Sequence, residues 1–142
     1  MDRLTKALVR DVMQKSVVTI SASDRLSTVE DIMTLGRVRH MPVVHAGKLV
    51  GVVSERDLLR ASLSNLSGHR HEEHRAFLHV VEIGRVMSTP PIVVTGDATV
   101  GEAAHIMAEK KIGCLPVVEG DELIGMITET DILHLVAGLP QD

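Results

Sequence analysis

Aromatic side chains are almost absent from this sequence: its 142 residues include one phenylalanine and neither tryptophan nor tyrosine. Base-stacking platforms for single-stranded nucleic acid are therefore excluded. Positive charge is also scarce, because 15 lysines and arginines face 19 acidic residues and leave a net charge of -4. Since a phosphate backbone is bound by a basic surface, we expect no nucleic-acid partner.

Cysteine is rare, and long apolar runs are missing. The single cysteine, Cys114, excludes an internal disulfide. Residues 1–13 carry charges where a signal peptide needs an apolar run, and no segment approaches the roughly 20 apolar residues of a membrane span. We therefore expect a cytoplasmic protein without membrane association, and its hydrophobic share of 44% is enough to bury a core.

The sequence repeats itself without a gap. "GVVSERD" at residues 51–57 returns as "GMITETD" at 125–131, an offset of 74 as from Gly51 to Gly125. About a dozen identical pairs over some fifty indicate an internal duplication. We place the first repeat at residues 9–64 and the second at 83–138, joined by a histidine-rich linker at 65–82.

Each repeat opens with the pattern of a strand followed by a helix. Short β-branched runs predict strands at 17–20 and 92–95. Apolar residues at helical spacing predict helices at 26–35 and 100–111. Ser23 and Asp24 precede the first of these helices and Asp97 precedes the second, and these residues are available as N-caps.

Each repeat closes with a hairpin and a second helix. "MPVVHAGKLVGVV" and "LPVVEGDELIGMI" each contain two apolar runs around a short turn with a glycine, which is typical of a hairpin. "SERDLLRASL" and "TETDILHLVA" begin with a hydroxyl residue and continue at helical spacing. The predicted fold class is therefore α/β, with the order strand, helix, strand, strand, helix in both repeats.

The hydroxyl and carboxylate that open each closing helix allow two interpretations. Ser54 with Asp57, and Thr128 with Asp131, have the spacing of a capping box, in which both side chains satisfy N–H groups of the first helical turn. Glutamate is the more usual carboxylate there, and a helix N-terminus also favours anions. Capping and ligand contact therefore both remain open.

The duplication, the order of elements, the "MPVV" and "LPVV" hairpin starts and the repeated G-h-h-[ST]-x-x-D motif, in which h is apolar, together resemble the CBS domain, named after cystathionine beta-synthase. The resemblance covers residues 9–63 and 83–138. It implies two motifs packed as one pseudo-twofold module, with clefts between them that commonly bind adenosine-containing ligands such as AMP, ADP or ATP. It implies a regulatory module rather than an enzyme, with no required cofactor, in which ligand binding shifts a conformation that an effector protein reads.

The resemblance also implies which residues contact the ligand. Asp57 and Asp131 would bind ribose hydroxyls, and Ser54 and Thr128 would contact ribose or phosphate. The residues before each hairpin would lie near the phosphates, and these are Arg39, His40, Gly113 and Cys114. The walls of the adenine slots would be Val17, Val18, Met41, Pro42, Ile92, Leu115 and Pro116. A surface charge for Arg39 and core positions for the aliphatic residues are the alternatives.

Each cleft in the family combines the aspartate of one motif with strand and pre-hairpin residues of the other. The first cleft would contain Thr128, Asp131, Val18, Arg39 and His40. The second would contain Ser54, Asp57, Ile92, Gly113 and Cys114. Only the first cleft has basic residues before the hairpin. Unless Arg56 reaches the second cleft and compensates, we therefore expect the two clefts to bind phosphate-bearing ligands with unequal affinities.

Other functions remain open beside nucleotide sensing. The same fold could serve as an interaction module whose clefts stay empty. The linker histidines His69, His71 and His74 could instead surround a metal, although no metal site is our main expectation. Related modules pair through helices into a flat disc, which implies a homodimer here through the helices at 26–35 and 100–111.

Overall fold

The computed structural model describes residues 2–66 and 71–141 and divides the chain into two compact units. Unit 1 comprises Met1–Val17 and Ile92–Asp142, and unit 2 comprises Val18–Pro91. Each unit therefore contains the sheet of one repeat together with the short segment that precedes the first strand of the other repeat. Both units are mixed α/β, as predicted.

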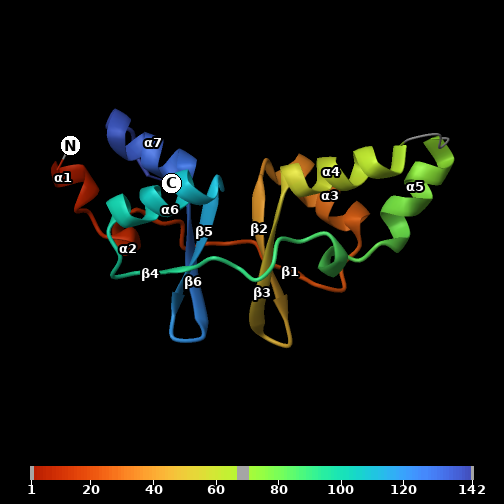
Figure 1. Cartoon of the computed structure of the whole chain (residues 1–142), viewed down its shortest axis with the longest axis horizontal. Coiled ribbons are helices and arrows are strands. Elements are labelled where there is room, and N and C mark those ends of the chain that lie inside the picture. The colour runs from red at the N-terminus through yellow and green to blue at the C-terminus, as the bar shows by residue number, and fades with distance from the viewer. Residues whose placement is uncertain (1, 67–70, 142) are drawn as a thin grey trace. The chain divides into compact units, whose positions relative to one another are not determined.

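Unit 2 has a three-stranded sheet in the order β1-β2-β3, with β1 parallel and β3 antiparallel to the central β2. The helices α3 and α4 lie at the end of this sheet away from the β2–β3 turn (Figure 1). The elements of unit 2 are β1 (Ile20–Ser21), α3 (Leu26–Gly36), β2 (His40–His45), β3 (Lys48–Ser54), α4 (Glu55–Leu66), α5 (His71–Val80) and the 3-10 helix η1 (Ile83–Arg85).

Unit 1 repeats this topology with the sheet order β4-β5-β6. Its helices α6 and α7 again lie away from the hairpin turn (Figure 1). The elements of unit 1 are α1 (Asp2–Thr5), α2 (Val9–Val12), β4 (Val94–Thr95), α6 (Val100–Lys110), β5 (Cys114–Glu119), β6 (Glu122–Thr128) and α7 (Glu129–Ala137).

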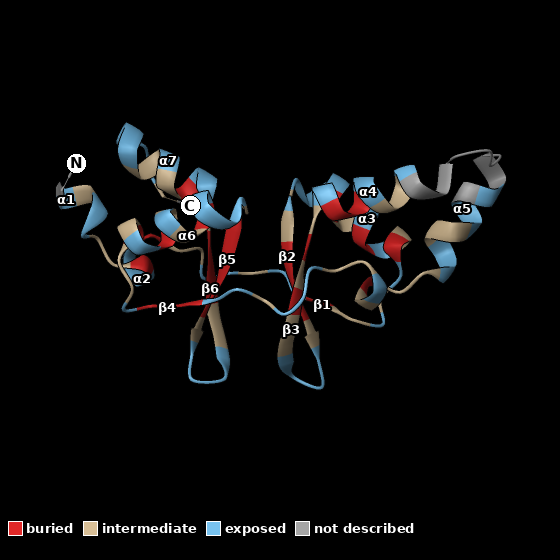
Figure 2. Ribbon diagram, viewed as in Figure 1, coloured by how far each residue is buried: buried red, intermediate tan, exposed pale blue. Residues whose placement is uncertain are grey.

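Each unit has its own hydrophobic core, built by the alternating aliphatic residues of its strands and by one side of its helices. Figure 2 shows buried residues where the strands meet the helices, whereas the hairpin turns are exposed. Leu115 and Ile127 are fully buried in unit 1, as are Leu26 and Met41 in unit 2. The segments that precede the first strands complete these cores, because Val9 is fully buried in unit 1. Its counterpart in unit 2 is the fully buried Ile83.

The opening strands are shorter than the sequence predicted. β1 starts at Ile20 rather than at residue 17, and β4 starts at Val94 rather than at residue 92. Strand length is set by pairing with the neighbouring strand. The pairing between β1 and β2 begins with Ile20 opposite Val43 and includes two residues of β1. The helices expected at 26–35 and 100–111 are confirmed as α3 and α6, with ends shifted by one residue.

The predicted caps of α3 and α6 are wrong. Arg25 is the N-cap residue of α3 and makes no side-chain cap hydrogen bond. In α6 the cap is not Asp97. Thr99 is the N-cap residue, and its hydroxyl oxygen accepts a hydrogen bond from the backbone N–H of Glu102 at 3.1 Å. Asp97 lies two positions earlier and pairs with Arg10 instead. Because the chain is still extended at Thr99, the carboxylate of Asp97 precedes the first helical turn.

Part of the predicted linker is helical. α5 covers His71–Val80, and its residues Phe77 and Leu78 pack against the core of unit 2. His69 and the side chains of His71 and His74 lie outside the described residues, so the metal hypothesis stays a hypothesis. None of the helices in the described ranges is both long and apolar enough to cross a membrane.

Candidate functional site

A capping box joins β6 to α7 in unit 1. The hydroxyl oxygen of Thr128 accepts a hydrogen bond from the backbone N–H of Asp131 at 3.3 Å. In return, Oδ2 of Asp131 accepts the backbone N–H of Thr128 at 2.8 Å and its hydroxyl at 3.0 Å. The capping interpretation is therefore confirmed, and it uses a single carboxylate oxygen.

The same arrangement joins β3 to α4 in unit 2. Oδ2 of Asp57 accepts the backbone N–H of Ser54 at 2.9 Å and its hydroxyl at 3.1 Å. The backbone N–H of Asp57 donates to Oγ of Ser54 at 3.1 Å. Both hydroxyl–aspartate pairs of the repeated motif thus have a structural role, whatever else they bind.

A second donor reaches each aspartate from the segment that precedes a first strand. In unit 1, Nε2 of Gln14 donates to Oδ1 of Asp131 at 3.2 Å. In unit 2, the hydroxyl of Ser88 donates to Oδ1 of Asp57 at 3.3 Å. Gln14 and Ser88 occupy equivalent positions, each directly after a Val-Met pair. The sequence analysis missed both residues, although that repeated pair was the signal that could have found them.

The glycine of the repeated motif makes this contact possible. Gln14 and Met126 exchange two backbone hydrogen bonds, at 2.8 and 3.0 Å, beside Gly125. A Cβ atom on Gly125 would lie 2.6 Å from the carbonyl oxygen of Gln14 and 2.6 Å from Sδ of Met13. Gly51 has the same role in unit 2, where a Cβ atom would lie 2.8 Å from the carbonyl oxygen of Ser88.

Both aspartates are buried, with 4% of Asp131 and 8% of Asp57 exposed. A buried carboxylate needs hydrogen-bond donors, and the capping box together with the second donor supplies them. Oδ1 of Asp131 lies outside the capping box and accepts its hydrogen bond from Gln14. Chemically, this oxygen can accept a hydrogen bond from a ligand hydroxyl in place of the one from Gln14.

The residues before each hairpin lie beside the capping box of the same unit. In unit 2, the carbonyl oxygen of Arg39 accepts the N–H of Glu55 at 2.9 Å, and His40 lies opposite Ser54 in the ladder. In unit 1, the carbonyl oxygen of Gly113 accepts the N–H of Glu129 at 2.9 Å. The structure therefore brings together, within each unit, the pre-hairpin and hydroxyl–aspartate residues that the sequence analysis selected. The predicted sharing of sites between repeats stays a prediction.

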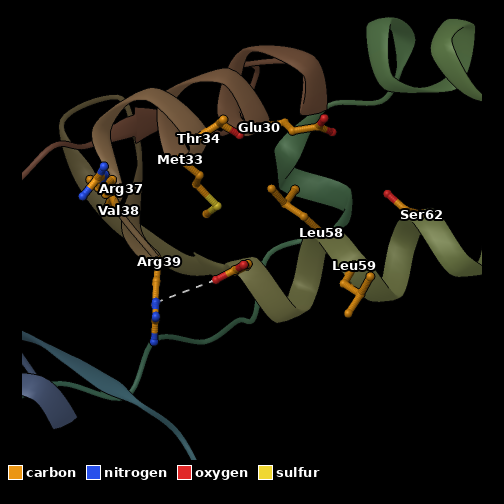
Figure 3. Close-up of a pocket in the computed structure, with 10 residues that line it drawn as sticks. Glu30, Met33, Thr34, Arg37, Val38, Arg39, Leu58, Leu59 and Ser62 are labelled. Carbon is orange, nitrogen blue, oxygen red and sulfur yellow. Dashed lines mark ion pairs between the residues drawn. The ribbon is translucent and has the colours of Figure 1, made fainter.

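The side chain of Arg39 lines a cavity of about 570 Å³ in unit 2, between α3 and α4. Met33 and Leu58 point into this cavity, and Nε of Arg39 lies 4.0 Å from a carboxylate oxygen of Glu55 (Figure 3). With 78% of its side chain exposed, Arg39 forms a surface ion pair with Glu55 as its one ion pair among the described residues. Such a pair contributes little to stability, so the guanidinium can turn toward another anion.

The predicted wall residues fall into two groups. Four are buried in their own unit, and these are Met41, Pro42, Leu115 and Pro116. Three are more accessible, and these are Val17, Val18 and Ile92. The four buried residues belong to the core of their unit. A ligand could contact them only at their backbone atoms or at the small exposed part of their side chains. Their function as walls stays a prediction.

Comparison with known families agrees with this duplicated arrangement. The model of the CBS domain matches residues 9–64 and 83–138. The chain belongs to the CBS domain family. A CBS domain-containing protein of Dictyostelium discoideum is 31% identical over 133 residues, which are 92% of each chain. Other relatives are longer: the chain spans 32% of an uncharacterised Methanocaldococcus jannaschii protein and 22% of an inosine-5′-monophosphate dehydrogenase from Korarchaeum cryptofilum.

Solved CBS domain structures share the fold. A Vibrio cholerae protein assigned to acetoin utilization, AcuB, superimposes with a TM-score of 0.80 at 34% identity, covering 94% of this chain and 93% of that one. The CBS domain pair of protein MJ0100, in complex with 5′-methylthioadenosine and S-adenosyl-L-methionine, has a TM-score of 0.78 at 25% identity, covering 93% and 97%. The fold class expected from the sequence is thereby confirmed.

Proposed function

We propose that this CBS domain pair is a regulatory module that binds an adenosine-containing ligand and passes a conformational change to a partner protein. The observation that carries the proposal is the buried carboxylate that occurs twice, with one oxygen committed to a helix cap and the other able to accept a hydrogen bond from a ligand hydroxyl. Adenosine compounds offer ribose hydroxyls as such donors. The MJ0100 pair, whose two ligands both contain adenosine, supports the same ligand class.

The roles of individual residues follow from their chemistry. Asp131 and Asp57 would accept ribose hydroxyls, while Thr128 and Ser54 hold the carboxylates in place. Arg39 would contact phosphate, since a guanidinium provides forked, charged donors. The remaining proposed contacts are those of His40, Arg56, Gly113, Cys114 and the wall residues Val17, Val18, Met41, Pro42, Ile92, Leu115 and Pro116.

Thermal unfolding with a ligand panel tests the function. We expect AMP, ADP, ATP or S-adenosylmethionine to stabilise the protein, by about 2.7 kcal/mol at a concentration 100 times the dissociation constant. AMP should stabilise more than adenosine, because only AMP can pair with Arg39. In Arg39→Ala that difference should disappear, whereas Arg85→Ala, which changes another exposed arginine of unit 2, should retain it.

Two results would contradict this proposal. If no compound of the panel shifts the unfolding temperature at millimolar concentration, the module does not sense adenosine ligands, and the interaction-module alternative is favoured. A shift with zinc or nickel alone would favour the histidine metal site.

We also propose that the protein forms a homodimer, with a change in the predicted surface. Among the described residues of α3 and α6, only Leu35 is a large apolar side chain that is exposed. By contrast, α4 and α7 each carry two such side chains among their described residues, Leu59 and Leu63 on α4 and Leu133 and Val136 on α7, and the equivalent Leu59 and Leu133 are 58% and 64% exposed. Isologous pairing would bury these residues.

Light scattering checks the dimer. At micromolar concentration we expect twice the chain mass, and the double variant Leu59→Glu and Leu133→Glu should be monomeric with an unchanged circular dichroism spectrum. A monomeric wild type would remove this proposal without affecting ligand binding.

A further inference from the structure

We propose that Gln14 determines the ligand affinity of unit 1, because its side chain occupies the carboxylate oxygen that a ligand hydroxyl would use. This inference rests on the proposed function and adds a residue outside the repeated motif to the site. Gln14 lies on the segment before the first strand, 117 residues away from Asp131 in the sequence, and donates to its Oδ1 at 3.2 Å.

The distribution of donors on Asp131 leads to this role. Oδ2 receives the N–H and the hydroxyl of Thr128, both within 3.0 Å, and is committed to the helix cap. Oδ1 is the oxygen left for a ligand, and Gln14 is the side chain that donates to it. Since only 4% of Asp131 is exposed, a ligand hydroxyl must displace the amide of Gln14 to reach Oδ1.

The displacement requires no change of the backbone. Gln14 exchanges two backbone hydrogen bonds with Met126, and the preceding N–H of Met13 donates to the carbonyl oxygen of Val9 at 2.8 Å. The main chain is therefore fixed while the side chain of Gln14, which is half-buried, can rotate about its own bonds. In this way ligand binding exchanges one hydrogen bond on Asp131 for another.

Unit 2 has a different set of groups around its aspartate, where Nη1 of Arg60 lies 4.0 Å from Oδ1 of Asp57 and a serine replaces the glutamine. Its equivalent residue, Ser88, donates to the two oxygens of Asp57 at 3.3 and 3.4 Å, which are long distances for a hydroxyl donor. A serine hydroxyl can also accept a hydrogen bond, so a ligand hydroxyl can join this contact without displacing it. Because one repeat has glutamine and the other serine at this position, we expect the two aspartates to differ in how readily they accept a hydrogen bond from a ligand hydroxyl.

Calorimetry with adenosine and 2′,3′-dideoxyadenosine tests the inference on the full chain. We expect Gln14→Ser and Gln14→Met each to bind adenosine about threefold to tenfold more tightly than the wild type at one site, the factor that one hydrogen bond represents. The affinity for dideoxyadenosine, which has no ribose hydroxyl, should not change. Without ligand, Gln14→Met should unfold at a lower temperature than the wild type, since Asp131 loses a donor, whereas Gln14→Ser should lie between the two because a serine hydroxyl can still donate, as Ser88 does in unit 2. Ser88→Ala is the matched control in unit 2. We expect it to change the adenosine affinity less than either Gln14 variant does, because a ligand hydroxyl need not displace Ser88.

The outcomes separate this inference from the proposed function. Unchanged or weaker adenosine binding in both Gln14 variants, with normal binding by the wild type, overturns the role of Gln14 alone. An equal gain for dideoxyadenosine also overturns it, because the effect would not pass through the ribose hydroxyls. Absence of adenosine binding by the wild type overturns both.

Discussion

Gly125→Ala is expected to lower the free energy of unfolding by about 1–3 kcal/mol, the usual cost of forcing extra atoms into a packed site. The new methyl group would meet the carbonyl oxygen of Gln14 at 2.6 Å. That oxygen is held by a hydrogen bond from Met126, so it cannot move without breaking the pairing between β6 and the preceding segment. Chemical denaturation of the variant and the wild type measures the difference.

Gly36→Ala is the matched control for this prediction. Gly36 is the last residue of α3, and a Cβ atom there would meet only the side chain of Val38, at 3.3 Å. We expect a change within about 0.5 kcal/mol, as for most surface substitutions. Gly51→Ala should behave like Gly125→Ala, because its nearest backbone atom is the carbonyl oxygen of Ser88 at 2.8 Å. Equal stability of all three variants would show that the close approach has no energetic importance.

Asp131→Ala should affect both stability and binding. Loss of the capping box should lower the free energy of unfolding by about 1–2 kcal/mol. The affinity for adenosine should also fall about tenfold or more, since hydrogen bonds to charged groups contribute about 1.5–3 kcal/mol each. Denaturation and calorimetry on the same preparation separate the two effects.

Asp131→Asn divides capping from ligand binding. Its amide oxygen can still accept the N–H of Thr128, so most of the stability should remain. Its negative charge is lost, and one of the two oxygens becomes a donor that cannot accept a ribose hydroxyl. Wild-type affinity in this variant would mean that Asp131 serves only as a cap.

Much of the fold could be predicted because its signals are local. The hairpins, the closing helices and the hydroxyl–aspartate spacing all lie within short stretches of sequence whose periodicity or turn residues indicate the structure. The opening strands were predicted too long. A β-branched run shows where a strand is favourable, whereas the length of the strand depends on how many residues pair with the neighbouring strand. Here only Ile20 and Ser21 find one in β2.

The contacts that complete the site could not be predicted in this way. Gln14 reaches Asp131 across 117 residues, and no periodicity links the two positions. Gly125 appeared only as a repeated glycine, and its reason, the close approach of Met13 and Gln14, is visible only in the packed unit. Local patterns identified the capping boxes, while the residues that surround them depend on which distant segment packs there.

The division of the chain into units also imposes an order on its assembly during synthesis. Unit 2 is made of consecutive residues, Val18–Pro91, so all its core partners have been synthesised before the second repeat is complete. Unit 1 is discontinuous, since Val9 and Val12 lie in the same core as Leu115 and Ile127. The apolar residues of the N-terminal segment therefore have no core to pack into until the last third of the chain has been synthesised. Their packing then closes a long loop of the chain.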